Sequence, residues 1–184
     1  MVGVHQSEEH RHVTATTPLD LQQVNPDDFE VRTLDDEIRV DELCGRLLLA
    51  VRDRLVTDDG LDPLAAGTLC HGADHFLREF VIAACGDNLF HLTAERVRQF
   101  AGHWYIIHAL EPAIGELAGI LAGVSACCQV LARHGLLGAA EAEAIGAACA
   151  DLPCYQQRID AFWAIEGDGY PRWQAVCPLP EGCR

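Results

Sequence analysis

The segment Cys70–His75, with the sequence CHGADH, holds the densest group of side chains that can do chemistry. Residues four positions apart share one face of a helix, so His71 and His75 are neighbours there, and Glu79 follows one turn later. Two histidines on one face can supply half of a zinc site, and the other ligands must come from elsewhere in the chain. Gly72 follows His71, so the HExxH pattern of metalloproteases lacks its glutamate base. Metal binding by His71 and His75 is therefore an alternative, and ordinary helix residues are the expectation.

The nine cysteines are the next candidates for chemistry. No basic region followed by an apolar one opens the chain, so we expect no secretory signal, a cytoplasmic location and reduced thiols. Oxidation of Cys177 and Cys183, which bracket the tail, is an open alternative, and no second pair completes a zinc ribbon. The vicinal pair Cys127-Cys128 lies in an apolar stretch, where a reactive thiolate is not favoured. We expect the helical cysteines to pack as small hydrophobic residues: Cys44, Cys70, Cys85, Cys127, Cys128 and Cys149.

Patterns typical of enzymes are missing from the sequence. It has no glycine-rich phosphate loop, no nucleophile elbow and no paired-carboxylate motif. We therefore predict no catalytic residue, no cofactor and no enzymatic activity.

The chain is strongly acidic, with 28 acidic against 13 basic residues and a formal net charge of −15. This charge repels nucleic-acid phosphates, so nucleic-acid binding at physiological salt is not expected. Arg78, Arg96 and Arg98 can form a small basic spot, although surface arginines among so many acids are more often salt-bridge partners.

Helix signals divide the chain into a polar arm over residues 1–33, one helical domain over 34–166 and a short irregular tail over 167–184. The arm is aperiodic and is predicted to be extended or disordered. Inside the domain, apolar residues recur at helical spacing and no run alternates as a strand does, which predicts an all-α bundle. Helix starts and stops are indicated at the following positions: Thr33, Gly60, Pro63, Thr93, Pro112, Gly135 and Pro153. The apolar stripes predict a core that includes Phe76, Phe80, Phe100, Trp104, Leu121 and Val124, and inward-facing Tyr155, Ile159, Phe162 and Trp163.

The stretch 113–132 is apolar and as long as a membrane span. It contains Glu116 and Gln129 and is rich in small residues, so we predict a buried central helix and no membrane association. Gly115, Gly119 and Gly123 recur every fourth residue and form a smooth ridge that lets another helix approach closely. Packing inside the domain is the preferred interpretation of this ridge, and a dimer interface is the alternative.

The middle helices resemble the SAM-like core-binding domain of tyrosine recombinases and phage integrases over residues 60–137. The residues that carry the resemblance are the opening Gly60-Leu61-Asp62-Pro63, the pair Phe76-Leu77, the capped start Leu92-Thr93-Ala94-Glu95-Arg96-Val97 and the ending Ala132-Arg133-His134-Gly135-Leu136-Leu137. This resemblance implies a four-helix, integrase-like core. The 184 residues show no counterpart of the family's catalytic domain and contain no lysine, so we expect no strand transfer. Positions that are usually basic in the family are here Cys70, His71, His75, Gly119, Ile120, Ser125 and Gln129.

These observations favour a non-enzymatic helical protein that acts by binding a macromolecule, preferably a protein partner or a second copy of the chain. Two alternatives stay open. One is weak DNA association through the integrase-like core, and the other is metal binding through His71 and His75.

Overall fold

The computed structural model describes residues 17–180 and residue 183, and every regular element in them is helical. The all-α class predicted from the apolar periodicity is confirmed for this part of the chain. No strand occurs among the described residues.

Helix α1 (Leu34–Thr57) begins at the predicted start, where Thr33 and Asp36 form a capping box. The Thr33 hydroxyl accepts a hydrogen bond from the Asp36 backbone N–H at 3.2 Å, and the Asp36 carboxylate accepts one from the Thr33 N–H at 3.0 Å. This reciprocal pair satisfies two N–H groups that a helix start otherwise leaves unpaired. Just beyond the end of the helix, Gly60 takes a φ of +66°, which reverses the chain towards the next helix.

Helix α2 (Pro63–Asp74) continues without a break into the π-helical segment η2 (His75–Ala84). The Asp62 carboxylate caps its start by accepting hydrogen bonds from the N–H groups of Leu64 and Ala65. A second π-helical segment, η4 (Phe100–Trp104), lies between α3 (Ala94–Gln99) and α4 (Tyr105–His108). The remaining elements are η1 (Pro26–Phe29), η3 (Leu89–His91), α5 (Ile114–Arg133), α6 (Ala139–Ala150), α7 (Leu152–Trp163) and α8 (Tyr170–Val176).

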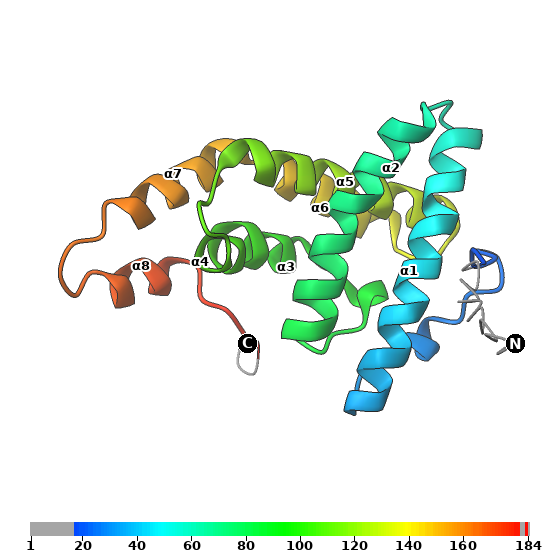
Figure 1. The fold of residues 1–184 in the computed structure, drawn as a ribbon, viewed down its shortest axis with the longest axis horizontal. Coiled ribbons are helices and arrows are strands. Elements are labelled where there is room, and N and C mark those ends of the chain that lie inside the picture. The colour runs from blue at the N-terminus through cyan, green and yellow to red at the C-terminus, as the bar shows by residue number, and fades with distance from the viewer. Residues whose placement is uncertain (1–16, 181–182, 184) are drawn as a thin grey trace, which may run out of the picture.

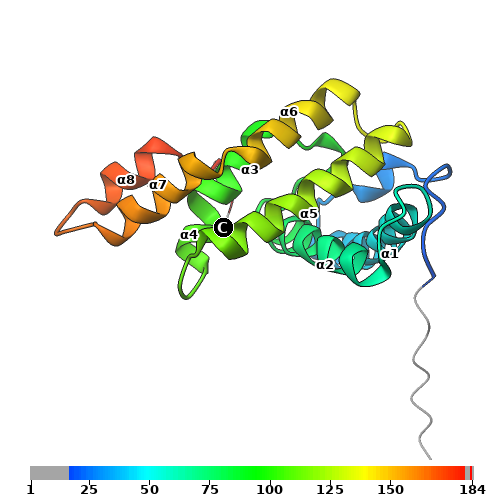
Figure 2. The ribbon, with the colours of Figure 1, turned by 90° about the horizontal axis from the view of Figure 1, so that it is seen from above.

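Helix α5 runs through the middle of the molecule and packs against α1, α2, α6 and α7. Figure 1 shows α1 and α2 at one end of an elongated molecule, while α7 and α8 form a hairpin that projects from the opposite end. Figure 2 shows the same hairpin from above, extending beyond α3 and α4. The hairpin is therefore the part of the fold most separated from the α1–α2 pair.

The two π-helical segments meet in an aromatic cluster at the centre of the core. The ring of Phe100 lies 5.0 Å from Phe76, 5.4 Å from Phe80 and 5.8 Å from Trp104 between centroids. Such centroid separations are typical of favourable aromatic pairs. The burial predicted from the stripes is confirmed for the whole set: Phe76, Phe80, Phe100, Trp104, Leu121 and Val124.

Two predictions about the ends of the chain were wrong. Residues 17–33 of the predicted arm lie against the core, because Leu21 and Phe29 are both only 2% exposed. Residues 170–176 of the predicted irregular tail form α8, whose Trp173 is buried. These segments are too short to show apolar residues at a regular helical spacing, so their contacts with the core could not be predicted from the sequence. Residues 1–16 lie outside the described part of the chain.

By length and composition α5 is also the one described helix that is long and apolar enough to cross a membrane. Half of the most apolar 18-residue stretch of α5 is buried among the other helices. The core helices of soluble proteins have the same length and composition.

Candidate functional site

A hollow of about 400 Å³ lies between α2, the start of η2 and the first half of α5. We call it the α2–α5 hollow, and its lining consists of Thr68, His71, Gly72, Asp74, His75, Glu79, Glu116, Gly119 and Ile120. The fold thus brings His71 and His75, the candidate metal ligands, next to Gly119 of the glycine ridge. Its volume is in the range of small-molecule sites.

Beside the hollow, α2 and α5 cross closely at glycines. A Cβ atom on Gly72 would lie 2.8 Å from the Gly119 carbonyl oxygen and 3.0 Å from the Ile120 Cα. A Cβ atom on Gly123 would overlap the Leu69 carbonyl oxygen and lie 2.7 Å from the Ala73 nitrogen. Any side chain at Gly72 or Gly123 would therefore force the helices apart.

Of the three glycines of the ridge, only Gly123 must lack a side chain for the helices to pack this closely, whereas Gly115 and Gly119 need not. A Cβ atom at either of these two positions meets no atom of the described chain within 4 Å. Gly119 faces the open space of the hollow, and Gly115 is exposed one turn earlier. Helices α2 and α5 cross, so they are in closest contact over a short stretch of α5 only. The recurrence of glycine at every fourth residue predicted a longer contact than this crossing allows.

Carboxylates dominate the charge of the hollow. Asp74 shares the Arg78 guanidinium with Asp41, at 3.3 Å from Asp74 and 2.6 Å from Asp41 Oδ2. Glu116 accepts a hydrogen bond of 2.8 Å from the Tyr105 hydroxyl. Neither Glu79 nor Glu116 forms an ion pair with any residue of the described chain. The hollow is therefore a negatively charged site whose only other titratable lining groups are the two imidazoles.

The two histidines occupy different environments. His71 is exposed, whereas the ring of His75 is half-buried, with its centroid 6.0 Å from the rings of Phe100 and Trp104. Within residues 17–180 and 183, no three His, Cys, Asp or Glu side chains are grouped so that they could hold a metal ion. The pair therefore has no third ligand in place there.

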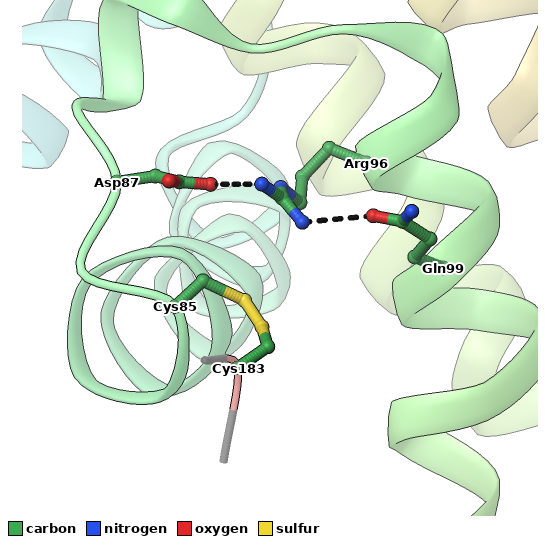
Figure 3. Close-up of a disulfide and its surroundings, with 5 residues drawn as sticks. All are labelled: Cys85, Asp87, Arg96, Gln99 and Cys183. Atoms are coloured by element: carbon green, nitrogen blue, oxygen red, sulfur yellow. Dashed lines mark hydrogen bonds and ion pairs between the residues drawn. A yellow bond between two sulfur atoms is a disulfide. The ribbon is translucent and has the colours of Figure 1, made fainter. Parts of the chain in front are cut away.

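The predicted basic spot does not form, because each of its arginines is engaged by an acidic neighbour. Arg78 binds Asp41 and Asp74, and Arg98 lies 3.7 Å from the Glu95 carboxylate. Arg96 pairs with Asp87 and also donates to the Gln99 side chain at 2.8 Å, as Figure 3 shows. The salt-bridge interpretation of these three residues is the one that the contacts favour.

Figure 3 also shows a disulfide between Cys85, at the end of η2, and Cys183, in the tail. The expectation that Cys85 is a free thiol packed in a helix was wrong, since pairing across so long a separation leaves no signal in one sequence. The other seven cysteines are free thiols. Burial raises the pKa of Cys70 to about 11 and of Cys128 to about 12, so these thiols are not reactive nucleophiles.

The α7–α8 hairpin carries aromatic residues that the sequence placed wrongly. Tyr155 and Ile159 are buried as predicted, but Trp163 is 59% exposed and Phe162 is only partly buried. Consecutive residues on a helix point about 100° apart, so Phe162 and Trp163 cannot both face one core. That adjacency is the signal from which an exposed tryptophan could have been inferred.

Comparison of the chain with models of known protein families, with characterised proteins and with solved structures gives no match. The resemblance to integrase core-binding domains therefore stays a prediction.

Proposed function

We propose that this chain is a non-enzymatic helical protein that binds another protein through the tip of its α7–α8 hairpin. We define the hairpin tip as residues 160–170, which comprise the end of α7, the connecting turn and the first residue of α8. The observation that carries the proposal is the exposure of Trp163, an aromatic residue with 59% of its surface in solvent. Tryptophan and tyrosine are enriched at the centres of protein interfaces, where they contribute most of the binding energy.

The aromatic side chains of the hairpin tip contact one another and the buried Trp173. Phe162 packs against Trp163 and against the buried Trp173, with centroid separations of 5.6 and 5.2 Å. Tyr170, which is 38% exposed, stacks on Trp173 at 5.8 Å. A partner that docks on these rings pays little to order them, because the supporting contacts already exist in the free protein.

The charges around these rings indicate the chemistry of the partner. Asp160, Glu166 and Asp168 are exposed at the hairpin tip, and Arg172 is an exposed base just beyond it. An apolar centre with an acidic rim is complementary to an apolar pocket rimmed by lysine and arginine. We therefore expect the partner to present such a basic-rimmed pocket.

Two alternatives have weaker support. DNA association needs arginines that are free to contact phosphates, and Arg78, Arg96 and Arg98 are each paired with carboxylates. Metal binding needs further ligands beside His71 and His75, and the described chain groups none with them.

The test places a photo-crosslinking amino acid, p-benzoylphenylalanine, at position 163 of the full chain in the cells that make the protein. The control carries it at position 110, because Leu110 is 99% exposed and lies outside the hairpin. We expect one discrete cross-linked protein from position 163 and none of that product from position 110. Identical products from both positions, or no product from position 163, would contradict the proposal, as would a product that contains only a second copy of this chain.

A further inference from the structure

The α2–α5 hollow has the properties of a ligand site that is separate from the hairpin tip. It is formed by different helices, and none of its lining residues belongs to α7 or α8. Its volume of about 400 Å³ can hold a small organic group. Gly72 and Gly119 contribute main chain to its lining, and Gly119 carries no side chain that would reduce the open space.

The charge of the hollow selects a cation. Three carboxylates line it, and no lysine or arginine side chain does. Arg78 offsets part of the charge of Asp74, but Glu79 and Glu116 have no ion-pair partner among the described residues. An occupant with a positive group gains attraction from both glutamates, whereas an anion is repelled.

The apolar part of the lining argues for an organic cation rather than a bare metal ion. Ile120 contributes an aliphatic wall, and the imidazole of His75 is held against Phe100 and Trp104. A carbon chain can lie along these surfaces while its charged end meets the carboxylates, as lysine and arginine side chains do on protein surfaces. A metal ion would instead need several grouped ligands, which residues 17–180 and 183 do not provide.

We infer that the α2–α5 hollow binds a guanidinium or ammonium group carried on a short carbon chain, with Glu79 and Glu116 facing the charge and Ile120 and His75 facing the chain. The Tyr105 hydroxyl holds Glu116 through a hydrogen bond of 2.8 Å and so acts as a positioning residue. Two sources offer this chemistry, a free amine and an arginine side chain of another protein.

A substitution at Gly119 can block the hollow. A Cβ atom at this position meets no atom within 4 Å and Gly119 lines the hollow, so Gly119→Leu places a side chain in that space without a clash at its Cβ. Gly115→Leu is the matched control, since its Cβ also meets no atom within 4 Å but it does not line the hollow. Both variants place the same residue on the same helix one turn apart.

The experiment measures binding of agmatine and of the peptide acetyl-Gly-Arg-Gly-amide to the full chain by calorimetry at low salt, with pentan-1-ol as the uncharged comparison. We expect agmatine or the peptide to bind and pentanol not to bind. Gly119→Leu should weaken binding at least tenfold, while Gly115→Leu should leave it within twofold. Stronger binding of agmatine identifies a free amine as the source, and stronger binding of the peptide identifies a protein side chain.

A second pair of variants removes a carboxylate charge without adding a side chain to the hollow. Glu79→Gln should weaken binding severalfold, and Glu143→Gln, an exposed acid on α6, should not. The inference is overturned if neither cation binds, if binding survives Gly119→Leu, or if Zn²⁺ binds while both organic cations fail. None of these results affects the cross-linking outcome at Trp163, so the two proposals can fail independently.

Discussion

The guanidinium carbon of Arg158 lies 4.0 Å from the centre of the Trp173 ring, and the Trp173 indole N–H donates to the Arg158 carbonyl oxygen at 3.0 Å. Arg158 belongs to α7 and Trp173 to α8, so these two contacts join the two helices of the hairpin. The Arg158 Nε also donates to the Gly102 carbonyl oxygen at 2.9 Å, which attaches the hairpin to η4. Trp163 follows Arg158 on α7 and so belongs to the hairpin that these contacts hold together.

Replacing Trp173 should therefore destabilise the protein far more than replacing Trp163. Trp173→Ala removes a side chain that is only 5% exposed, and we expect a loss of about 3–5 kcal/mol in the free energy of unfolding. Trp163→Ala should change it by about 0.5 kcal/mol, as for other exposed positions. Chemical denaturation of the two variants measures both values. Equal losses would mean that the hairpin does not pack as described.

The crossing of α2 and α5 makes opposite predictions for two glycines of the same helix. Gly123→Ala should destabilise the protein by about 1–3 kcal/mol, because its Cβ overlaps the Leu69 carbonyl. Gly119→Ala should stabilise it by up to about 1 kcal/mol, since alanine is the better helix former and the Cβ meets no atom within 4 Å. Thermal unfolding of the pair is the measurement. A stabilising Gly123→Ala would show that the helices do not approach this closely.

His103 should make stability depend on pH. Its side chain is fully buried and its Nδ1–H donates to the Cys177 carbonyl oxygen at 2.5 Å. Burial lowers the pKa of His103 below its ordinary value of 6.5, and the positive charge of Arg158 acts in the same direction. The unfolded chain then takes up a proton as the pH falls through about 6.5, whereas the folded chain takes it up only at lower pH, so this contribution to stability is complete above this range and is lost on acidification.

The measurement is the free energy of unfolding between about pH 7.5 and 5.5, where histidine charge changes. His103→Asn keeps a donor for the Cys177 carbonyl but does not titrate, so its stability should fall less steeply with pH than that of the parent. His91→Asn, at an exposed position, should keep the parent slope. If the free energy of unfolding of His103→Asn changed with pH as steeply as that of the parent protein, His103 would not control the pH dependence of stability.

Nucleic-acid binding should be weak. The net charge of −15 and the pairing of Arg78, Arg96 and Arg98 leave few cations for phosphates. In a mobility-shift assay on duplex and four-way-junction DNA at ~150 mM salt, we expect no binding tighter than the non-specific range of roughly 10⁻⁴ to 10⁻⁶ M. Submicromolar binding that disappears in an Arg96→Ala, Arg98→Ala double variant would favour the integrase-like alternative.

The sequence predicted those parts of the fold that local chemistry determines. The helix starts at Thr33 and Pro63 and the helix stop at Gly135 are each set by residues close in the chain, and the structure confirms all three. The buried aromatic stripe from Phe76 to Trp104 was also predictable, since helical periodicity survives in the π-helical segments well enough to keep these rings inward.

The candidate sites were only partly predictable because they depend on contacts between distant residues. His71 and His75 were identified by their spacing, but the hollow beside them exists only where α5 brings Gly119 and Glu116 across α2. The Cys85–Cys183 disulfide and the Asp41–Arg78 pair likewise join segments far apart in the chain. The integrase-like arrangement of the middle helices stays a prediction.

The most direct test of the central claim is the dissociation constant of the purified partner, once cross-linking has identified it, for the parent protein, Trp163→Ala and Leu110→Ala. Truncating an interface tryptophan costs about 2 kcal/mol or more, so Trp163→Ala should weaken binding at least ~30-fold. Leu110→Ala should bind as the parent does, because Leu110 is exposed but lies outside the hairpin. Unchanged affinity of a folded Trp163→Ala protein would contradict the claim that the hairpin tip is the binding surface.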